Sequence, residues 1–152
     1  MDATTTITEV IDRIEASRNE IATRYETRLK QHVRVYAPLS SAQLAATAAG
    51  MIGMFVRMLR ARSAEGGGID TRMLHELEVV SQERARQGIG VGDLYTAFSI
   101  LQATGREVVF ERTADSDLRT VSRAWVEIDI MTALVLSWIL DEHGHRIEGA
   151  QK

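Results

Sequence analysis

Acidic and histidine side chains near the end of the chain are the first candidates for metal chemistry. Residues 141–145 read Asp-Glu-His-Gly-His, in which Glu142 and His145 form one Glu-x-x-His step. A ferritin-like di-iron site needs two such steps and two further inward-facing glutamates from other helices. The sequence contains one, so we predict no metal site and interpret these residues as a solvated helix end. A metal-dependent helical-bundle enzyme remains an alternative.

Motifs for nucleophilic or phosphate chemistry are absent from the sequence. It has no Gly-x-Ser-x-Gly turn, no Gly-rich loop followed by lysine and no His-Glu-x-x-His. The glycines at 66–68 lack the preceding strand of a phosphate loop and indicate a linker. We therefore predict no catalytic residues, and a protein that binds or signals rather than an enzyme.

Two further side chains stand out because they fall on apolar helix faces. His32 continues the apolar face of the first expected helix, where an axial haem ligand would have to lie, although a buried histidine bonded to a carbonyl explains the pattern better. Arg84 lies one turn after Val80, at the end of another apolar face. Its guanidinium would either cap the carbonyls of the helix end or hold an anionic group at the mouth of an apolar pocket.

The elements that must position these residues are helices. The 152 residues are 45% hydrophobic with one proline, and apolar residues recur at steps of three or four rather than in alternation. This predicts an all-α fold of about five helices in a single domain over residues 1–152. The lack of cysteine, the net charge of −3 without a basic stripe, and a longest apolar run at residues 130–140 predict a cytoplasmic protein that neither binds nucleic acid nor inserts into a membrane.

Capping boxes mark the starts of the first two expected helices. A Thr-x-x-Glu box at Thr6 predicts a long helix that runs from there toward Pro38. Ser40 and Gln43 form a second box, which opens a helix over about residues 41–62. The first half of this second helix carries no charge, so we expect it to be buried.

Three more helices follow from the remaining signals. Asp70 as an N-cap and Gly88 as a C-terminal signal predict a helix between them. The next helix is expected to begin within residues 90–93. The last should start near Asp115 and reach at least His143, which makes it long like the first.

We expect the last helix to be covered both by its own domain and by a second copy of the chain. Between residues 130 and 140 its apolar side chains occupy every angular sector, and a helix that is apolar all round must be covered on all sides. The face toward its own core should contain Val121, Trp125, Ile128, Thr132, Val135 and Ile139. The interface of the homodimer is predicted to contain Ile130, Leu134, Trp138, Ile7 and Ile11.

Residues 83–98 carry a resemblance to a known family. They read Glu-Arg-Ala-Arg-Gln-Gly-Ile-Gly-Val-Gly-Asp-Leu-Tyr-Thr-Ala-Phe, which is similar to a segment of the RsbR-type sensor domains, the non-haem globin-like modules at the N-termini of stressosome co-antagonists. In that family an Arg-x-x-x-Gly step closes one helix, and an acid, a leucine and an aromatic open the next. The helix from Trp125 onward also resembles the long dimer-forming helix of the family. Gly90 departs from the pattern, because the family usually has serine or threonine there.

The resemblance implies a globin-like helical fold without haem, a homodimer joined through the terminal helices, and a stress-response signalling role with a downstream partner protein. No sulfate-transporter-like output domain follows in this sequence, which implies a sensor fragment or a free-standing form, and some relatives of this fold bind acyl chains. We therefore predict a dimeric sensor or adaptor that binds an apolar, anionic, fatty-acid-like molecule and no cofactor. The expected ligand-binding residues are Arg84, Met51, Met54, Phe55, Met58, Phe98 and Leu101. A haem-binding globin-type sensor and a purely structural interaction module are the alternatives.

Overall fold

The computed structural model describes residues 3–63, 75, 79 and 82–151, and these residues form helices without a strand. The α-helices are α1 (Ala3–Ala16), α2 (Arg18–His32), α3 (Ser41–Ser63), α5 (Val91–Glu111) and α6 (Leu118–Gln151). Two short 3-10 helices are η1 (Arg34–Tyr36) before α3 and η2 (Asp115–Asp117) before α6, and residues 82–86 are the described end of a further helix before α5. The predicted all-α class is confirmed.

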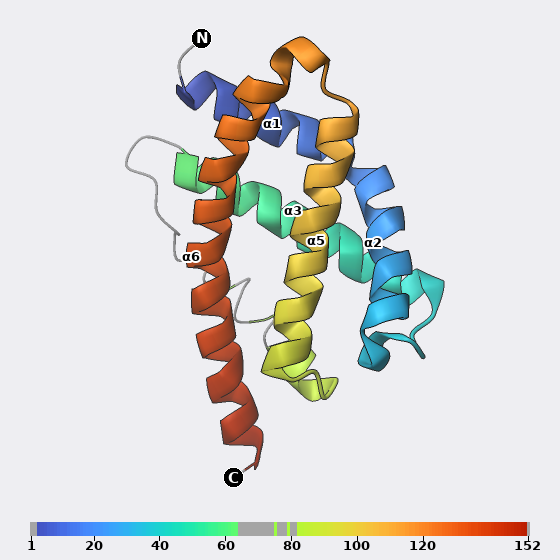
Figure 1. The fold of residues 1–152 in the computed structure, drawn as a ribbon. Helices are drawn as coiled ribbons and strands as arrows, with labels where there is room; N and C mark the ends of the chain where they lie inside the picture. Colours follow the sequence, from blue (N-terminus) through green and yellow to red (C-terminus); the bar gives the residue numbers. More distant parts are fainter. Residues whose placement is uncertain (1–2, 64–74, 76–78, 80–81, 152) are drawn as a thin grey trace.

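The α-helices pack as a bundle in which α5 and α6 run antiparallel beside each other (Figure 1). α2 lies along the other side of α5, and α1 crosses one end of the bundle. α3 runs behind α5 and α6 and packs against α1, α2 and α6. One core therefore collects apolar side chains from every helix, for example Ile11, Tyr25, Ile52, Leu101 and Ile128.

The single long first helix predicted from Thr6 toward Pro38 is wrong, because the chain breaks at Ser17 into α1 and α2. Ser17 has φ −96° and ψ 9°, and its Oγ accepts a 2.6 Å hydrogen bond from Arg112 Nη1. The break changes the direction of the chain, so the apolar faces of both helices can pack into the same core (Figure 1). The first helix also begins at Ala3, before the capping box that was expected to open it.

The predicted start of the second helix is confirmed by both hydrogen bonds of its capping box. The Gln43 N–H donates to Ser40 Oγ at 3.2 Å, and the Ser40 N–H donates to Gln43 Oε1 at 2.8 Å. The charge-free first half of this helix is buried on one face only, at Leu44 and Ala48. The expectation that this half is buried therefore holds for one face only, because a helix packed from one side leaves its other face in solvent. The exposed residues of this half include Ala42, Ala45, Ala46, Ala49 and Gly50.

α3 also contains the apolar segment Ser41–Ala61, which is long and apolar enough to cross a membrane by length and composition. In the bundle 53% of this segment is buried against the other helices. Packing in the core of the bundle therefore accounts for the apolar side chains of this segment.

The helix before α5 ends at Gly88, as predicted, with the hydrogen bonds of a Schellman motif. Gly88 has φ +76°, its N–H donates to the Ala85 carbonyl at 3.0 Å, and the Ile89 N–H donates to the Arg84 carbonyl at 3.0 Å. Glycine adopts this left-handed conformation without the steric cost that a Cβ brings. The predicted start of this helix at Asp70, and the glycine linker before it, lie outside the described residues.

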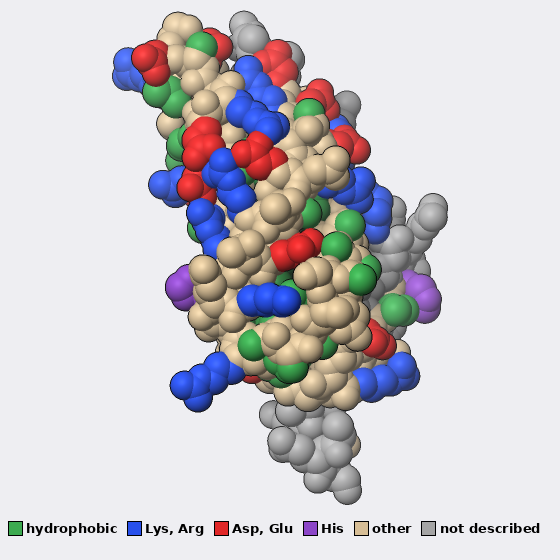
Figure 2. Space-filling view, turned by 90° about the vertical axis from the view of Figure 1, so that its right-hand side faces the viewer, with side chains coloured by type: hydrophobic (Ala, Val, Ile, Leu, Met, Phe, Trp, Pro, Cys, Tyr) green, Lys and Arg blue, Asp and Glu red, His purple; other side chains and the backbone are tan. Residues whose placement is uncertain are grey.

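Ion pairs join α2 to α5 on the surface. Arg24 Nη2 lies 2.6 Å from Glu20 Oε1 and 2.8 Å from Glu111 Oε2, and Arg28 pairs with Glu107. The hydrogen bond from Arg24 lowers the pKa of the Glu111 carboxyl from its ordinary value. Figure 2 looks onto this side of the molecule and shows acidic and basic side chains mixed over its upper half. Such exposed pairs orient the two helices and contribute little stability each.

Candidate functional site

α6 carries an exposed apolar face. Val126, Ile130 and Leu134 are 56%, 51% and 54% exposed, and Ala133 beside them is exposed as well. At 3.6 residues per turn, all of them lie within about 60° of Ile130 around the helix axis. Val126 was missed by the sequence reasoning, although its position one turn before Ile130 is the signal that could have identified it. We call these four residues the α6 face, a grouping of apolar side chains that is typical of an interaction surface.

The opposite side of α6 lies in the core. The buried side comprises Val121, Ala124, Trp125, Ile128, Met131 and Thr132. The Trp125 ring packs edge-on against Phe110, with ring centroids 6.0 Å apart. Val135 and Ile139, the remaining members of the predicted core series, have side chains outside the described residues. Within one subunit α6 is therefore covered on one side and exposed on the other.

The two ends of the α6 face carry opposite charges. Arg119 and Arg123 are exposed toward the N-terminal end of α6, and Asp141 is exposed toward its C-terminal end. All three lie within about 20° of Ile130 around the helix axis. Glu127 is exposed at the edge of the face. The face thus has an apolar centre between a basic end and an acidic end.

The other residues predicted for the interface are placed differently. Ile7 is partly buried against the core, and Ile11 is fully buried at 0% exposure. Ile11 therefore has no surface to offer a second chain in this conformation, because it already packs inside its own subunit. The Trp138 side chain lies outside the described residues.

A buried arginine lies at the end of the helix that precedes α5. Arg84 is 7% exposed, and its Nη1 donates to Gln87 Oε1 at 3.0 Å. Its Nε is buried without a hydrogen-bond partner, and no carboxylate pairs with it in the part of the chain that the structure describes. A guanidinium in this position can donate a charge-assisted hydrogen bond to an anionic group.

Two buried tyrosines, Tyr25 of α2 and Tyr36 of η1, lie within electrostatic reach of this arginine. Burial raises the pKa of both hydroxyls, and the positive charge of Arg84 acts in the opposite direction. The Tyr25 hydroxyl has no hydrogen-bond partner among the described residues. Neither tyrosine was singled out from the sequence, although a hydroxyl on a buried helix face needs a partner and could have marked them. We call these three residues the Arg84 cluster.

The apolar residues predicted to bind a ligand are all buried in the core. They are Met51, Met54, Phe55, Met58, Phe98 and Leu101. Phe55 and Leu101 line a cavity together with Trp125 and Gly105, and its volume of about 10 Å³ has room for about one water molecule. In this conformation that cavity is far too small for an acyl chain.

The residues weighed for haem and metal chemistry lie on two helices: His32 ends α2, whereas Glu142 and His145 lie within α6, which continues to Gln151. His32 is exposed, so the expectation that it lies on a buried face is wrong. Leu29 is the last buried residue of α2, because the helix ends at His32. Among the described residues, no group of three or more His, Cys, Asp or Glu could hold a metal ion. The Glu142 and His145 side chains lie outside those residues.

Comparison with known proteins assigns the chain to a family. The model of the family described as the RsbT co-antagonist protein rsbRD N-terminal domain matches residues 4–152. No curated protein and no solved structure matches the chain significantly. The resemblance to RsbR-type domains predicted from residues 83–98 is thereby confirmed. The chain belongs to the RsbT co-antagonist rsbRD N-terminal domain family, a family of stressosome-related signalling domains.

Proposed function

We propose that this signalling domain acts in the cytoplasm as a homodimer joined through the α6 face and passes its signal to a partner protein. The α6 face carries the proposal: Val126, Ile130 and Leu134 are each more than half exposed, on a helix whose opposite side is in the core. Covering these side chains with a second apolar surface removes them from water, which stabilises the pair. Membership of a signalling family supports the role of the assembly.

The order of residues along α6 favours a second copy of the same helix, in antiparallel orientation. An antiparallel pair centred on Ile130 brings residues equally far before and after it opposite each other. Val126 then meets Leu134 of the partner subunit, and Arg119 meets Asp141 of the partner subunit. A parallel pair would place like charges opposite each other at both ends, which is repulsive. One self-complementary face that pairs with its own copy is the usual form of a homodimer.

Cross-linking of single cysteines tests this arrangement directly, because the natural chain has no cysteine. We expect Ile130→Cys to cross-link efficiently to its own copy with a short bismaleimide, because Ile130 lies at the centre of the antiparallel pair. Val126→Cys and Leu134→Cys should each cross-link weakly alone and efficiently when the two variants are mixed. Ala103→Cys, at an exposed position of α5, is the matched control. Denaturing gels report the yields.

Two results would contradict this proposal. A monomer by light scattering, with Ile130→Cys cross-linking no more than Ala103→Cys, would exclude the dimer through α6. Equal self-cross-linking of Val126→Cys, Ile130→Cys and Leu134→Cys would exclude the antiparallel orientation and indicate a parallel pair.

We also propose that the domain senses an apolar, anionic small molecule of the fatty-acid type at the Arg84 cluster. The support is the buried guanidinium of Arg84 and the unpartnered hydroxyl of Tyr25, which could both donate to a carboxylate. The apolar part of the molecule would have to displace core side chains, since the cavity beside Phe55 and Leu101 holds about 10 Å³. The methionines of α3 suit such repacking because thioether chains adapt easily.

Native mass spectrometry with added decanoate tests this second proposal. We expect a bound decanoate on the natural chain and an affinity about tenfold or more lower for Arg84→Met, because a charge-assisted hydrogen bond is lost while the side-chain volume is largely kept. Arg34→Met, at an exposed position of η1, should bind as the natural chain does. No bound decanoate on the natural chain, or equal binding by Arg84→Met, would exclude the Arg84 cluster as the site.

A further inference from the structure

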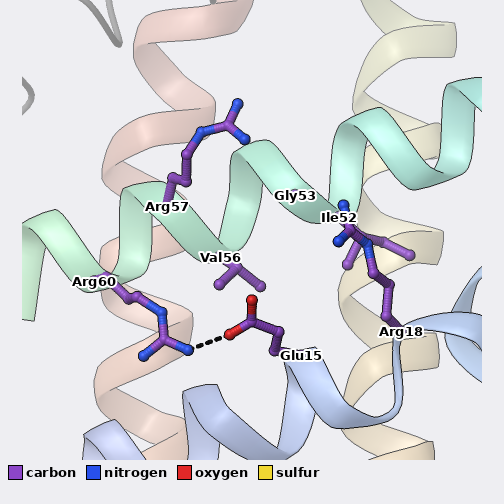
Figure 3. A pocket seen from close by; sticks show the side chains of 7 residues that line it. All are labelled: Glu15, Arg18, Ile52, Gly53, Val56, Arg57 and Arg60. Atoms are coloured by element: carbon purple, nitrogen blue, oxygen red, sulfur yellow. Dashed lines mark hydrogen bonds and ion pairs between the residues drawn. The ribbon is translucent and has the colours of Figure 1, made fainter.

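A small cavity lies where α1, α2, α3, α5 and α6 meet, and each of these helices contributes to its lining. Gln102 and Trp125 are the residues with polar side-chain atoms among the described ones that line it. None of these lining residues is charged, so the cavity favours a neutral occupant, because burying an unpaired charge is costly. A larger, charged pocket lies between α3 and the α1–α2 junction (Figure 3), and among the described residues it shares only Ile52 with the small cavity.

Trp125 carries a hydrogen-bond donor that no described residue uses. Trp125 is 3% exposed and lines the cavity, and its Nε1–H is buried without a hydrogen-bond partner. A buried N–H that has left water without gaining another acceptor is unfavourable, and such groups are rare in folded proteins. The donor therefore favours an occupant of the cavity that has an acceptor atom.

Gln102 of α5 supplies the second polar group. Its Nε2 donates to Asp129 Oδ1 at 2.5 Å, which leaves the amide oxygen of Gln102 to accept a further hydrogen bond. The indole N–H of Trp125 and this oxygen give one donor and one acceptor. A neutral molecule that both accepts and donates suits this pair, and a buried water makes between two and four such bonds.

Gly105 leaves the space beside Trp125 open. Glycine is less favourable than alanine inside a helix, and Gly105 lies within α5. A Cβ at Gly105 would lie 3.9 Å from Trp125 Cη2, which is an ordinary van der Waals distance, so no close contact with a neighbouring helix requires glycine here. A methyl group at this position would instead occupy space in the cavity. The glycine is therefore consistent with a cavity that holds an occupant.

We propose that this cavity binds one water molecule, which accepts a hydrogen bond from Trp125 Nε1 and donates one to the Gln102 amide oxygen. The volume of about 10 Å³ matches a single water. The water completes a chain of hydrogen bonds from Trp125 on α6 to Gln102 on α5 and on to Asp129 on α6. Asp129 directly precedes Ile130 of the α6 face, so the chain ties α5 to α6 next to that face.

NMR cross-relaxation between water and the indole N–H of Trp125 tests the proposal on the natural chain. We expect the signal of a long-lived bound water at this N–H. Trp138→Phe assigns the resonance, because Trp125 is then the one remaining tryptophan. A high-resolution crystal structure should show one ordered water between Trp125 Nε1 and Gln102. An indole N–H without the bound-water signal, or a crystal in which the cavity holds xenon under pressure and no water, would overturn the proposal.

Gly105→Ala separates the water from the fold. The added methyl group takes the place of the water while alanine favours the helix, so we expect the bound-water signal to be lost and the helicity by circular dichroism to be unchanged. Gly50→Ala makes the same change within α3, where a Cβ meets no atom within 4 Å, and should keep the signal. Gln102→Met removes the amide oxygen at similar volume and should weaken the signal.

The position of the water is wrong if the signal persists in Gly105→Ala, or if Gly50→Ala loses it to the same extent. An undiminished signal in Gln102→Met would exclude the amide oxygen as the acceptor and overturn the hydrogen-bonded chain. These results are independent of the dimer and of decanoate binding, because no residue of the α6 face or of the Arg84 cluster lines the cavity.

Discussion

Replacing Ile130 with glutamate is expected to convert the proposed dimer into a folded monomer. In a two-fold pair the substitution occurs twice, and each copy places an unpaired charge in the apolar centre of the interface. A penalty of about 4 kcal/mol raises the dissociation constant by roughly a thousandfold. Sedimentation velocity over a range of concentrations measures the change. The helix itself should remain intact, because Ile130 is 51% exposed in the single subunit.

Tyr95→Glu is the matched control for this prediction. Tyr95 is 54% exposed on α5, so this variant makes the same change in net charge on a large exposed side chain away from α6. It should sediment as the natural protein does. If Ile130→Glu remained a dimer of unchanged affinity, the pairing through the α6 face would be disproved.

Leu101→Ala is expected to lower the free energy of unfolding by about 2–5 kcal/mol, the range for removing a buried leucine side chain. Leu101 is 4% exposed and already borders the small cavity beside Trp125, so the deletion enlarges a space that the surrounding rings cannot readily fill. Urea unfolding followed by circular dichroism measures the loss. The measurement is best made in the Ile130→Glu background, so that dissociation of subunits does not contribute.

Ile100→Ala provides the control at the adjacent position of the same helix. Ile100 is partly buried and packs at the edge of the core, so we expect it to cost less than half as much as Leu101→Ala. Equal losses for the two variants would mean that Leu101 does not occupy the interior position that its burial indicates.

Local signals explain why several helix boundaries could be predicted from the sequence. The capping box of Ser40 and Gln43 acts within four residues, and the left-handed turn at Gly88 depends on the absence of one Cβ. The buried face of α5 follows helix periodicity in the same way, since Leu94, Phe98 and Leu101 recur at steps of three or four and are all buried. These features require no knowledge of distant parts of the chain.

Features that depend on distant contacts could not be predicted in the same way. Apolar residues continue at helical spacing on both sides of Ser17, so the sequence pattern does not predict a break there. The break is explained by a distant contact, because Arg112 at the end of α5 donates a hydrogen bond to the Ser17 hydroxyl. From the apolar pattern we also predicted that Ile11 and Ile130 both lie in the dimer interface. Ile11 is fully buried in its own subunit, whereas Ile130 is half exposed. An apolar side chain fits a core and an interface equally well, so composition cannot distinguish the two.

Because α6 is long, a small tilt of its buried part produces a much larger displacement at its C-terminal end. This helix has 34 residues, is anchored in the bundle around Trp125 and runs past the near ends of α2 and α5 (Figure 1). From Trp125 to residue 151 it extends about 39 Å, so a tilt of about 5° displaces its end by roughly 3 Å. Under the proposed function, we expect α6 to act as a lever arm that turns a small rearrangement of core side chains into a displacement of about 3 Å at its end.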